Sequence, residues 1–380
     1  MGTLITSLQG HRRASGWRAF DPYIVVTSLV LIGFGLVAIW SADSTHSLSP
    51  NGAAGHQVLY LLLGIPLMLG LASLDYRYIK TFAWVIYAGT LALLGLVLVV
   101  GSNIGGSTRW FKFGPITIQP SEIAKLAVII ALAAFIADRG EEMDRLVNYV
   151  LAAAVVGIPA VLVYQQPDLG TAGVFAFVWL IMLLMSRTRL LYLFGTLVAA
   201  VPAGFVAWHF VVHSYMRQRL LISYDPQSDP LGAGFNIIQA QLSIGSSGLF
   251  GHGLAGSLES QLNLLGVRTT DFIFAHAMGM FGFFGALALF VTYLILLWRT
   301  LHVARVARDE FGQILAIGIT AMIFFQAFVN MGMNIGLMPV TGIPLPFVSA
   351  GGSSLWTLLA SIGLLQSVLI HQQRLGFQPD

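Results

Sequence analysis

Residues 81–100 read TFAWVIYAGTLALLGLVLVV and contain no charged side chain. An α-helix rises about 1.5 Å per residue, so a run of this length crosses a hydrocarbon core about 30 Å thick. Similar apolar runs lie near residues 23–41, 57–74, 123–137, 147–164, 171–186, 192–212, 272–298, 313–336 and 353–371. The sequence therefore predicts an all-α, polytopic integral membrane protein of about ten transmembrane helices.

The composition of the whole chain agrees with a membrane protein. Of its 380 residues, 57% are hydrophobic and 9% are charged, whereas a soluble domain carries about 25% charged residues. The chain contains no cysteine, which excludes disulfides, thiolate metal sites and cysteine nucleophiles. We expect residues 1–380 to form a single transmembrane domain whose first span is not cleaved.

Basic residues indicate which side of the membrane each loop faces. They gather before the first predicted span, in alternate loops and after the last span: Arg12, Arg13, Arg18, Arg77, Lys80, Arg139, Arg145, Arg187, Arg189, Arg299, Arg305, Arg308 and Arg374. The positive-inside rule then places the N-terminal segment 1–22 and the tail 372–380 in the cytoplasm. Topology thus explains the basic excess, and nucleic-acid binding is not needed to explain it. Residues 213–271 become a large extracellular loop between spans seven and eight.

Six further basic residues lie in or beside two outer-facing segments, 102–125 and 213–271, where the rule disfavours them: Arg109, Lys112, Lys125, Arg217, Arg219 and Arg268. Salt bridges at a wet interface would explain any single one of them, each contributing little. As a set they indicate an anionic partner. Lys125 lies inside an apolar run, where an ionisable group is costly unless it serves a pathway or a site.

The first outer segment, residues 107–127, reads STRWFKFGPITIQPSEIAKLA. Ser121 follows a proline and is predicted to cap the fourth span. Glu122 and Lys125 are three residues apart, which is typical of an intrahelical ion pair. The same two residues, together with Arg109 and Lys112, would equally form a cationic cradle for a phosphate or pyrophosphate.

Two aspartates stand at the edges of predicted spans. Asp168, in QPDLGT, fits a tight turn that opens the sixth span, or a carboxylate that orients the basic groups of a site. Asp271, in TTDFIFA, fits the N-cap of the eighth span. It also fits a general base, because the edge of a low-dielectric region disfavours the charged carboxylate and raises its proton affinity.

The last outer segment, residues 338–354, reads MPVTGIPLPFVSAGGSS. Its prolines, followed by Gly351 and Gly352, interrupt any helix. Broken backbone at membrane depth is tolerated only where protein or a watered cavity satisfies its polar groups. The segment is therefore predicted to be a re-entrant outer loop before span ten that lines a site.

Together these motifs resemble the SEDS family (shape, elongation, division and sporulation), and more its elongation branch than its division branch. The resembling segments are STRW with QPSEIAK, QQPDLGT, YMRQRL with DPQSDPLGAGFNIIQ, GLFGHG with SQLNLL, TDFIF, and GIPLPFVSAGGSS. The resemblance implies a peptidoglycan glycosyltransferase that polymerises lipid II at the outer face of the cytoplasmic (inner) membrane. It also implies a class B penicillin-binding protein as partner.

By this resemblance, Asp271 is the candidate base for the 4-hydroxyl of the acceptor sugar. The predicted substrate-binding residues are Arg109, Lys112, Glu122, Lys125, Arg217 and Arg268, and the predicted structural residues are Asp168, Gly351 and Gly352. Relatives commonly carry paired glutamates after TDFIF, where this chain has Gly279 and Met280. No cofactor is therefore assigned, and dependence on a divalent cation such as Mg²⁺ or Mn²⁺ is left open.

Two other function classes are compatible with the sequence. Many spans with buried charge also suit a flippase or transporter of the lipid-linked precursor. An inverted internal repeat would support that class, and the two halves of the sequence show no convincing one. A non-catalytic scaffold of the wall-synthesis complex is the third class, favoured only by the altered segment after Asp271.

Overall fold

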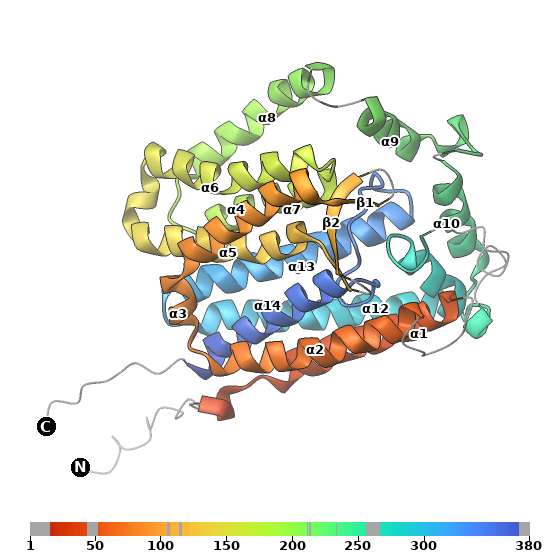
Figure 1. The fold of residues 1–380 in the computed structure, drawn as a ribbon, viewed down its shortest axis with the longest axis horizontal. Helices are drawn as coiled ribbons and strands as arrows, with labels where there is room; N and C mark the ends of the chain where they lie inside the picture. The colour runs from red at the N-terminus through yellow and green to blue at the C-terminus, as the bar shows by residue number, and fades with distance from the viewer. Residues whose placement is uncertain are drawn as a thin grey trace, which may run out of the picture.

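The computed structural model describes residues 16–43, 52–104, 107–113, 116–210, 212, 214–232, 234–255 and 267–371. Its long helices lie roughly side by side along one axis (Figure 1). They are α1 (Pro22–Ala42), α2 (Ala53–Ser73), α4 (Ala83–Val100), α5 (Pro120–Arg139), α6 (Leu146–Gln165), α7 (Leu169–Leu184), α8 (Leu190–Phe210), α12 (Ile273–Val306), α13 (Glu310–Asn334) and α14 (Gly352–Ile370). Shorter helices are η1 (Gly16–Ala19), α3 (Tyr76–Thr81), η2 (Gly140–Asp144), α9 (Ser214–Tyr224), η3 (Pro226–Ser228), α10 (Phe235–Ser246) and η4 (Gly253–Ala255).

The helix content confirms the predicted polytopic all-α membrane fold. Among the described residues, nine helices are long and apolar enough to cross a membrane. The sixth predicted span corresponds to α7, an apolar helix of 16 residues. The terminal segments before residue 16 and after residue 371, like residues 256–266 of the long outer loop, lie outside the described residues.

The outer segment after α4 contains the only strands of the described chain. β1 (Ser102–Ile104), β2 (Ser107–Phe113) and β3 (Ile116–Ile118) form an antiparallel sheet in the order β1-β2-β3. The aromatic residues of β2 and the isoleucines of β3 favour strands. The all-α prediction missed this sheet, because such short strands leave no periodicity that a sequence of this apolar character would reveal.

Burial separates the helices into a core and a margin. The spans of α5, α13 and α14 are 83%, 78% and 89% buried within the protein, whereas that of α8 is 6% buried. Figure 1 shows α8 and α9 along one margin of the molecule. α14 packs closely on α2, where Gly363 leaves room for the Met68 backbone and Gly352 for the Tyr60 ring. The core helices therefore fix the geometry of the loops at their ends.

Helix α12 is interrupted at Gly282, whose backbone has φ +65° and ψ −160°. The end of the segment after α10 crosses α12 at this point. His252 N donates to the Gly279 carbonyl at 2.9 Å, and Phe283 N donates to the Gly248 carbonyl at 3.0 Å. The crossing segment thus supplies partners for backbone groups that a continuous helix would have paired internally.

The two backbones approach each other through glycines. A Cβ atom on Gly251 would overlap the Met280 carbonyl, and one on Gly282 would overlap the Gly251 nitrogen. Both glycines also have a positive φ, a conformation that side chains disfavour. The crossing therefore requires glycine in both segments, at Gly251 and at Gly282.

We expect Gly282→Ala to destabilise the protein by about 1–3 kcal/mol, because the substitution combines an unfavourable φ with an overlap against backbone. Gly89→Ala on α4 is the matched control, since a Cβ atom there meets open space. Thermal unfolding of both variants in the same detergent checks the prediction. Equal melting temperatures would contradict the described crossing.

Candidate functional site

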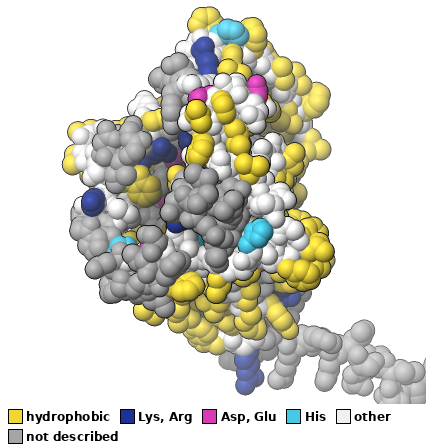
Figure 2. Space-filling view, turned by 90° about the vertical axis from the view of Figure 1, so that its right-hand side faces the viewer, with side chains coloured by type: hydrophobic (Ala, Val, Ile, Leu, Met, Phe, Trp, Pro, Cys, Tyr) yellow, Lys and Arg dark blue, Asp and Glu magenta, His cyan; other side chains and the backbone are white. Residues whose placement is uncertain are grey.

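A pocket of about 550 Å³ opens at the end of the bundle that carries the sheet and the loop between α13 and α14. It is lined from α2, β2, β3, α5, α9, the segment before α12, that loop and the start of α14. Its described lining residues include two acids, Glu122 and Asp271, and two arginines, Arg109 and Arg219. Viewed toward this end, basic and acidic side chains lie among apolar surface (Figure 2).

Asp271 lies on the turn that precedes α12. The N-cap of that helix is Phe272, and no side chain caps it, so the N-cap interpretation of Asp271 is wrong. Its half-buried side chain instead lines the pocket. Gly342 borders the carboxylate, since a Cβ atom on this glycine would lie 3.7 Å from Asp271 Oδ2. The carboxylate is therefore available to a ligand in the pocket.

The surroundings of Asp271 disfavour its charged form. Burial raises the pKa of the carboxyl above its ordinary value. Arg219, a hydrogen bond with the Thr270 side chain and Arg109 each lower that pKa, without cancelling the effect of burial, and Asp168 raises it. A pocket carboxylate with increased proton affinity has the chemical character of a general base.

Glu122 and Lys125 form the intrahelical ion pair that their spacing predicted. Lys125 Nζ lies 2.8 Å from Glu122 Oε1, and the two side chains are 2% and 6% exposed. Glu122 lines the pocket and Lys125 does not. Gln119 rather than Ser121 is the N-cap of α5. The predicted Ser121 cap is wrong because the helix begins two residues earlier, with Pro120 as its first residue.

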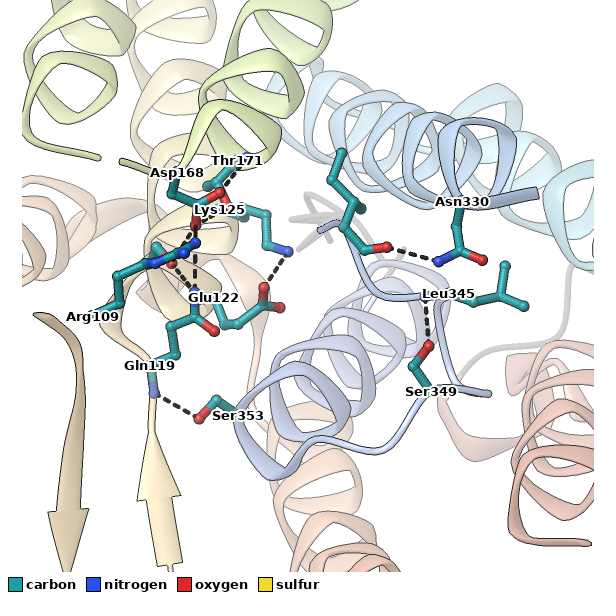
Figure 3. A network of polar contacts seen from close by, with 12 residues as sticks. Arg109, Gln119, Glu122, Lys125, Asp168, Thr171, Asn330, Leu345, Ser349 and Ser353 are labelled. Atoms are coloured by element: carbon teal, nitrogen blue, oxygen red, sulfur yellow. Dashed lines mark hydrogen bonds and ion pairs between the residues drawn. The ribbon is translucent and has the colours of Figure 1, made fainter. Parts of the chain in front are cut away.

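Asp168 caps α7 and also lies beside Arg109, so its contacts fit both interpretations of this residue. As N-cap of α7, its carboxylate accepts bonds from Thr171 N at 3.1 Å and Thr171 Oγ1 at 2.9 Å. Its Oδ2 atom also lies 3.9 Å from Arg109 Nη1 and accepts a bond from Gln119 Nε2 at 3.4 Å. Figure 3 shows these side chains converging, with Gln119 N bonded to Ser353 of α14. Arg109 is thus tied to the helix core.

Four of the six predicted substrate-binding residues do not line the pocket: Lys112, Lys125, Arg217 and Arg268. Lys112 is exposed on β2, three positions from Arg109. Residues an odd number of positions apart on a strand point to opposite faces. Arg268 is half-buried, and its charge interacts with Asp43 at the end of α1. Neither residue is brought to the pocket with Arg109.

Arg219 takes the place in the pocket that was predicted for Arg217. Both residues lie on α9, where two positions correspond to about 200° around the helix axis. Arg217 instead donates to the His209 carbonyl at 2.8 Å and lies over the Trp208 ring. Arg219 belongs to the six basic residues that break the positive-inside pattern. The sequence thus marked Arg219 as a misplaced basic residue. It did not show which of Arg217 and Arg219 faces the pocket, because the rotation of α9 was not known.

The loop between α13 and α14 is irregular, as predicted for a re-entrant segment, and its second half is buried over residues 345–349. Gln57 of α2 holds this loop through its backbone. Its Oε1 atom accepts a bond from Gly351 N at 3.1 Å, and its Nε2 atom donates to the Ser349 carbonyl at 3.3 Å. A Cβ atom on Gly352 would lie 2.9 Å from the Tyr60 ring. The sequence analysis missed Gln57, whose signal was one amide at the start of an apolar run.

The described residues contain no group of three or more His, Asp or Glu side chains that could hold a metal ion. Mg²⁺ is commonly bound by one or two carboxylates together with substrate phosphates. A divalent cation held by the described residues would therefore need further ligands from the substrate.

Comparison with known proteins assigns this chain to a family. The model of the family FTSW_RODA_SPOVE, described as cell cycle protein, matches residues 22–374. The peptidoglycan glycosyltransferase MrdB of Escherichia coli K12 is 38% identical over 359 residues, which cover 94% of this chain and 95% of MrdB.

Two solved structures share the fold. One, from work on the structural coordination of polymerization and crosslinking by a peptidoglycan synthase complex, has a TM-score of 0.79 at 32% identity and covers 93% of this chain and 98% of its own. The rod shape determining protein RodA of Thermus thermophilus has a TM-score of 0.70 at 29% identity, covering 94% of this chain and 99% of RodA. With the family match extending over residues 22–374, the chain belongs to the FtsW/RodA/SpoVE family, the SEDS proteins that its motifs resemble.

Proposed function

We propose that this chain is a peptidoglycan glycosyltransferase that polymerises lipid II into glycan strands during cell elongation. The observation that carries the proposal is the pocket in which Asp271, a carboxylate with raised proton affinity, is accompanied by Arg109 and Arg219. A base beside two cations suits the attack of a sugar hydroxyl on a pyrophosphate-linked sugar. The relatives named as peptidoglycan glycosyltransferases support the same reaction.

The proposed reaction follows from the chemistry of these side chains. Asp271 accepts the proton of the acceptor 4-hydroxyl. As that proton leaves, the hydroxyl oxygen bonds to the anomeric carbon of the donor sugar. The bond between that carbon and the pyrophosphate oxygen breaks, and negative charge develops on the leaving pyrophosphate. Arg109 and Arg219 stabilise this charge, with Asp168 orienting Arg109. Lys125 keeps Glu122 in place as its buried counter-ion.

The placement of the pocket supports an outer-face site. Strand β2, which lines the pocket, lies at the opposite end of the bundle from α3 (Figure 1), the helix that carries Arg77 and Lys80. The positive-inside rule assigns that basic end to the cytoplasm. Both termini are then cytoplasmic, the protein resides in the inner membrane, and the loop 213–271 is extracellular within a single domain.

We assign a class B penicillin-binding protein as the partner. One structural relative, 32% identical to this chain, comes from work on a peptidoglycan synthase complex that coordinates polymerization and crosslinking. A glycan strand made at the outer face is the substrate that a crosslinking partner requires. A transporter or a scaffold does not require a general base, so Asp271 favours the enzyme over both alternatives.

We expect Asp271→Asn to lower lipid II polymerisation by about 100-fold to 10,000-fold, because asparagine cannot accept the acceptor proton. Purified protein, with and without its penicillin-binding partner, is incubated with lipid II, and the glycan chains are quantified. Asp225→Asn is the control, as this aspartate is outside the pocket lining and its side chain makes no capping bond. A near-parental rate for Asp271→Asn would contradict the assignment of Asp271 as the general base.

The pH dependence of kcat/KM, which reports the pKa of the free enzyme, follows from the raised pKa of Asp271. The base works when deprotonated, so activity is present above its pKa and is lost as the pH falls through it. The loss should therefore begin above the ordinary aspartate value of about 3.9. Arg219→Ala should move it to still higher pH, because Arg219 lowers this pKa. His56 also lines the pocket and is tested separately. His56→Gln should lose activity at the same acidic pH as the parent. A shift to lower pH in Arg219→Ala would contradict the assignment.

Arg109→Ala and Arg219→Ala should each reduce kcat/KM for lipid II by about 10-fold to 100-fold, the loss of one charge-assisted contact worth about 1.5–3 kcal/mol. Lys112→Ala is the control, since Lys112 is equally basic and lies on the same strand as Arg109 but is exposed outside the pocket. Steady-state kinetics on variants with parental melting temperatures provide the test. A loss in Lys112→Ala as large as in Arg109→Ala would restore the broader cradle predicted from sequence.

A further inference from the structure

Three consecutive backbone carbonyls ahead of α12 are held from outside their own segment. Ala350 N donates to the Thr269 carbonyl at 2.8 Å, and Ser349 Oγ donates to the Thr270 carbonyl at 2.7 Å. The Asp271 carbonyl is the third and accepts bonds from α13. The turn that carries the candidate base is therefore fastened at successive residues by two different elements.

The bonds from α13 come from two asparagines one helical turn apart. Asn330 Nδ2 and Asn334 Nδ2 lie 3.1 Å and 3.0 Å from the Asp271 carbonyl oxygen, so both of its lone pairs are used. Asn330 also donates to the Ile343 carbonyl at 2.8 Å, and Asn334 accepts a bond from Ala275 N at 3.2 Å. Figure 3 shows Asn330 directed from α13 toward the loop. The two amides join the loop, the turn and the start of α12.

Packing alone does not explain these asparagines. Both are fully buried, and burying an amide is costly unless its hydrogen bonds are made. An apolar residue would fill the same space in the core of α13 without that cost. One bond from each amide goes to the backbone carbonyl of Asp271, whose carboxylate lines the pocket.

We propose that Asn330, Asn334 and Ser349 are positioning residues that fix the Asp271 carboxylate relative to the acceptor hydroxyl. The inference rests on the proposed role of Asp271 as general base. The aspartate side chain is short, so anchoring the backbone at that residue limits where its oxygens reach. A displacement of about 1 Å between reacting groups can lower the rate about 100-fold.

The test compares Asn330→Ala and Asn334→Ala with Asn148→Ala. Asn148 is also buried and also donates to a backbone carbonyl, that of Glu142 at 2.7 Å, but it lies at the start of α6 and does not line the pocket. We expect kcat per folded molecule to fall about 10-fold to 100-fold in the first two variants, with lipid II binding within about twofold of the parent. Asn148→Ala should keep its kcat. Parental kcat in both test variants, or an equal loss in the control, would overturn the proposal.

A second measurement separates positioning from general loosening. In the Asp271→Asn background, under single-turnover conditions at high enzyme concentration, Asn334→Ala should cause less than about a twofold further loss, because the base that it positions is absent. A further loss as large as in the parent would show an effect that bypasses Asp271 and would overturn the proposal. If the alanine variants of α13 do not fold, Ser349→Ala, which removes one hydroxyl, takes their place with the same expectations.

The two proposals fail in different ways. If Asp271→Asn polymerises lipid II at the parental rate, the proposed function of Asp271 is wrong. If Asp271→Asn is impaired while folded Asn330→Ala, Asn334→Ala and Ser349→Ala keep the parental kcat, only the positioning inference is wrong.

Discussion

Backbone that leaves helical geometry within a membrane protein must find its hydrogen-bond partners inside the protein, because lipid offers none. Two irregular segments meet this requirement at the pocket: the turn before α12 and the loop between α13 and α14. They bond to each other through Ala350 and Ser349. Two helix side chains supply further hydrogen-bond partners to the loop backbone: Gln57 from α2 and Asn330 from α13. The pocket geometry depends on this mutual satisfaction.

The charged side chains around the pocket likewise have partners inside the protein. Lys125 balances Glu122 inside α5, and Arg109 approaches Asp168 at the start of α7. A buried pair is expensive to break, because removal of one partner leaves an uncompensated charge. The Lys125–Glu122 pair, whose side chains are 2% and 6% exposed, is of this kind. Arg109 is already aimed by Asp168, which reduces the reorganisation needed when an anionic group enters.

The sequence predicted what depends on local pattern. Spans, the irregular last loop, the ion pair in α5 and the capping position of Asp168 follow from hydropathy, prolines and i,i+3 spacing. It did not predict what depends on contacts between distant segments. The choice of Arg219 over Arg217 depends on how α9 is rotated against the bundle. The break at Gly282 lies in an apolar run that resembles a continuous helix until the segment after α10 is placed across it.

The crossing of Gly251 and Gly282 has a consequence for how this contact can evolve. Compensation between contacting residues normally works by enlarging one side chain while shrinking the other. Here a new Cβ atom on either residue meets main-chain atoms of the opposing segment, and main chain cannot be made smaller. Neither position can rescue a change at the other. Among homologues that keep the crossing, the pair should be jointly invariant, and methods that infer contacts from correlated substitutions would receive no signal from it.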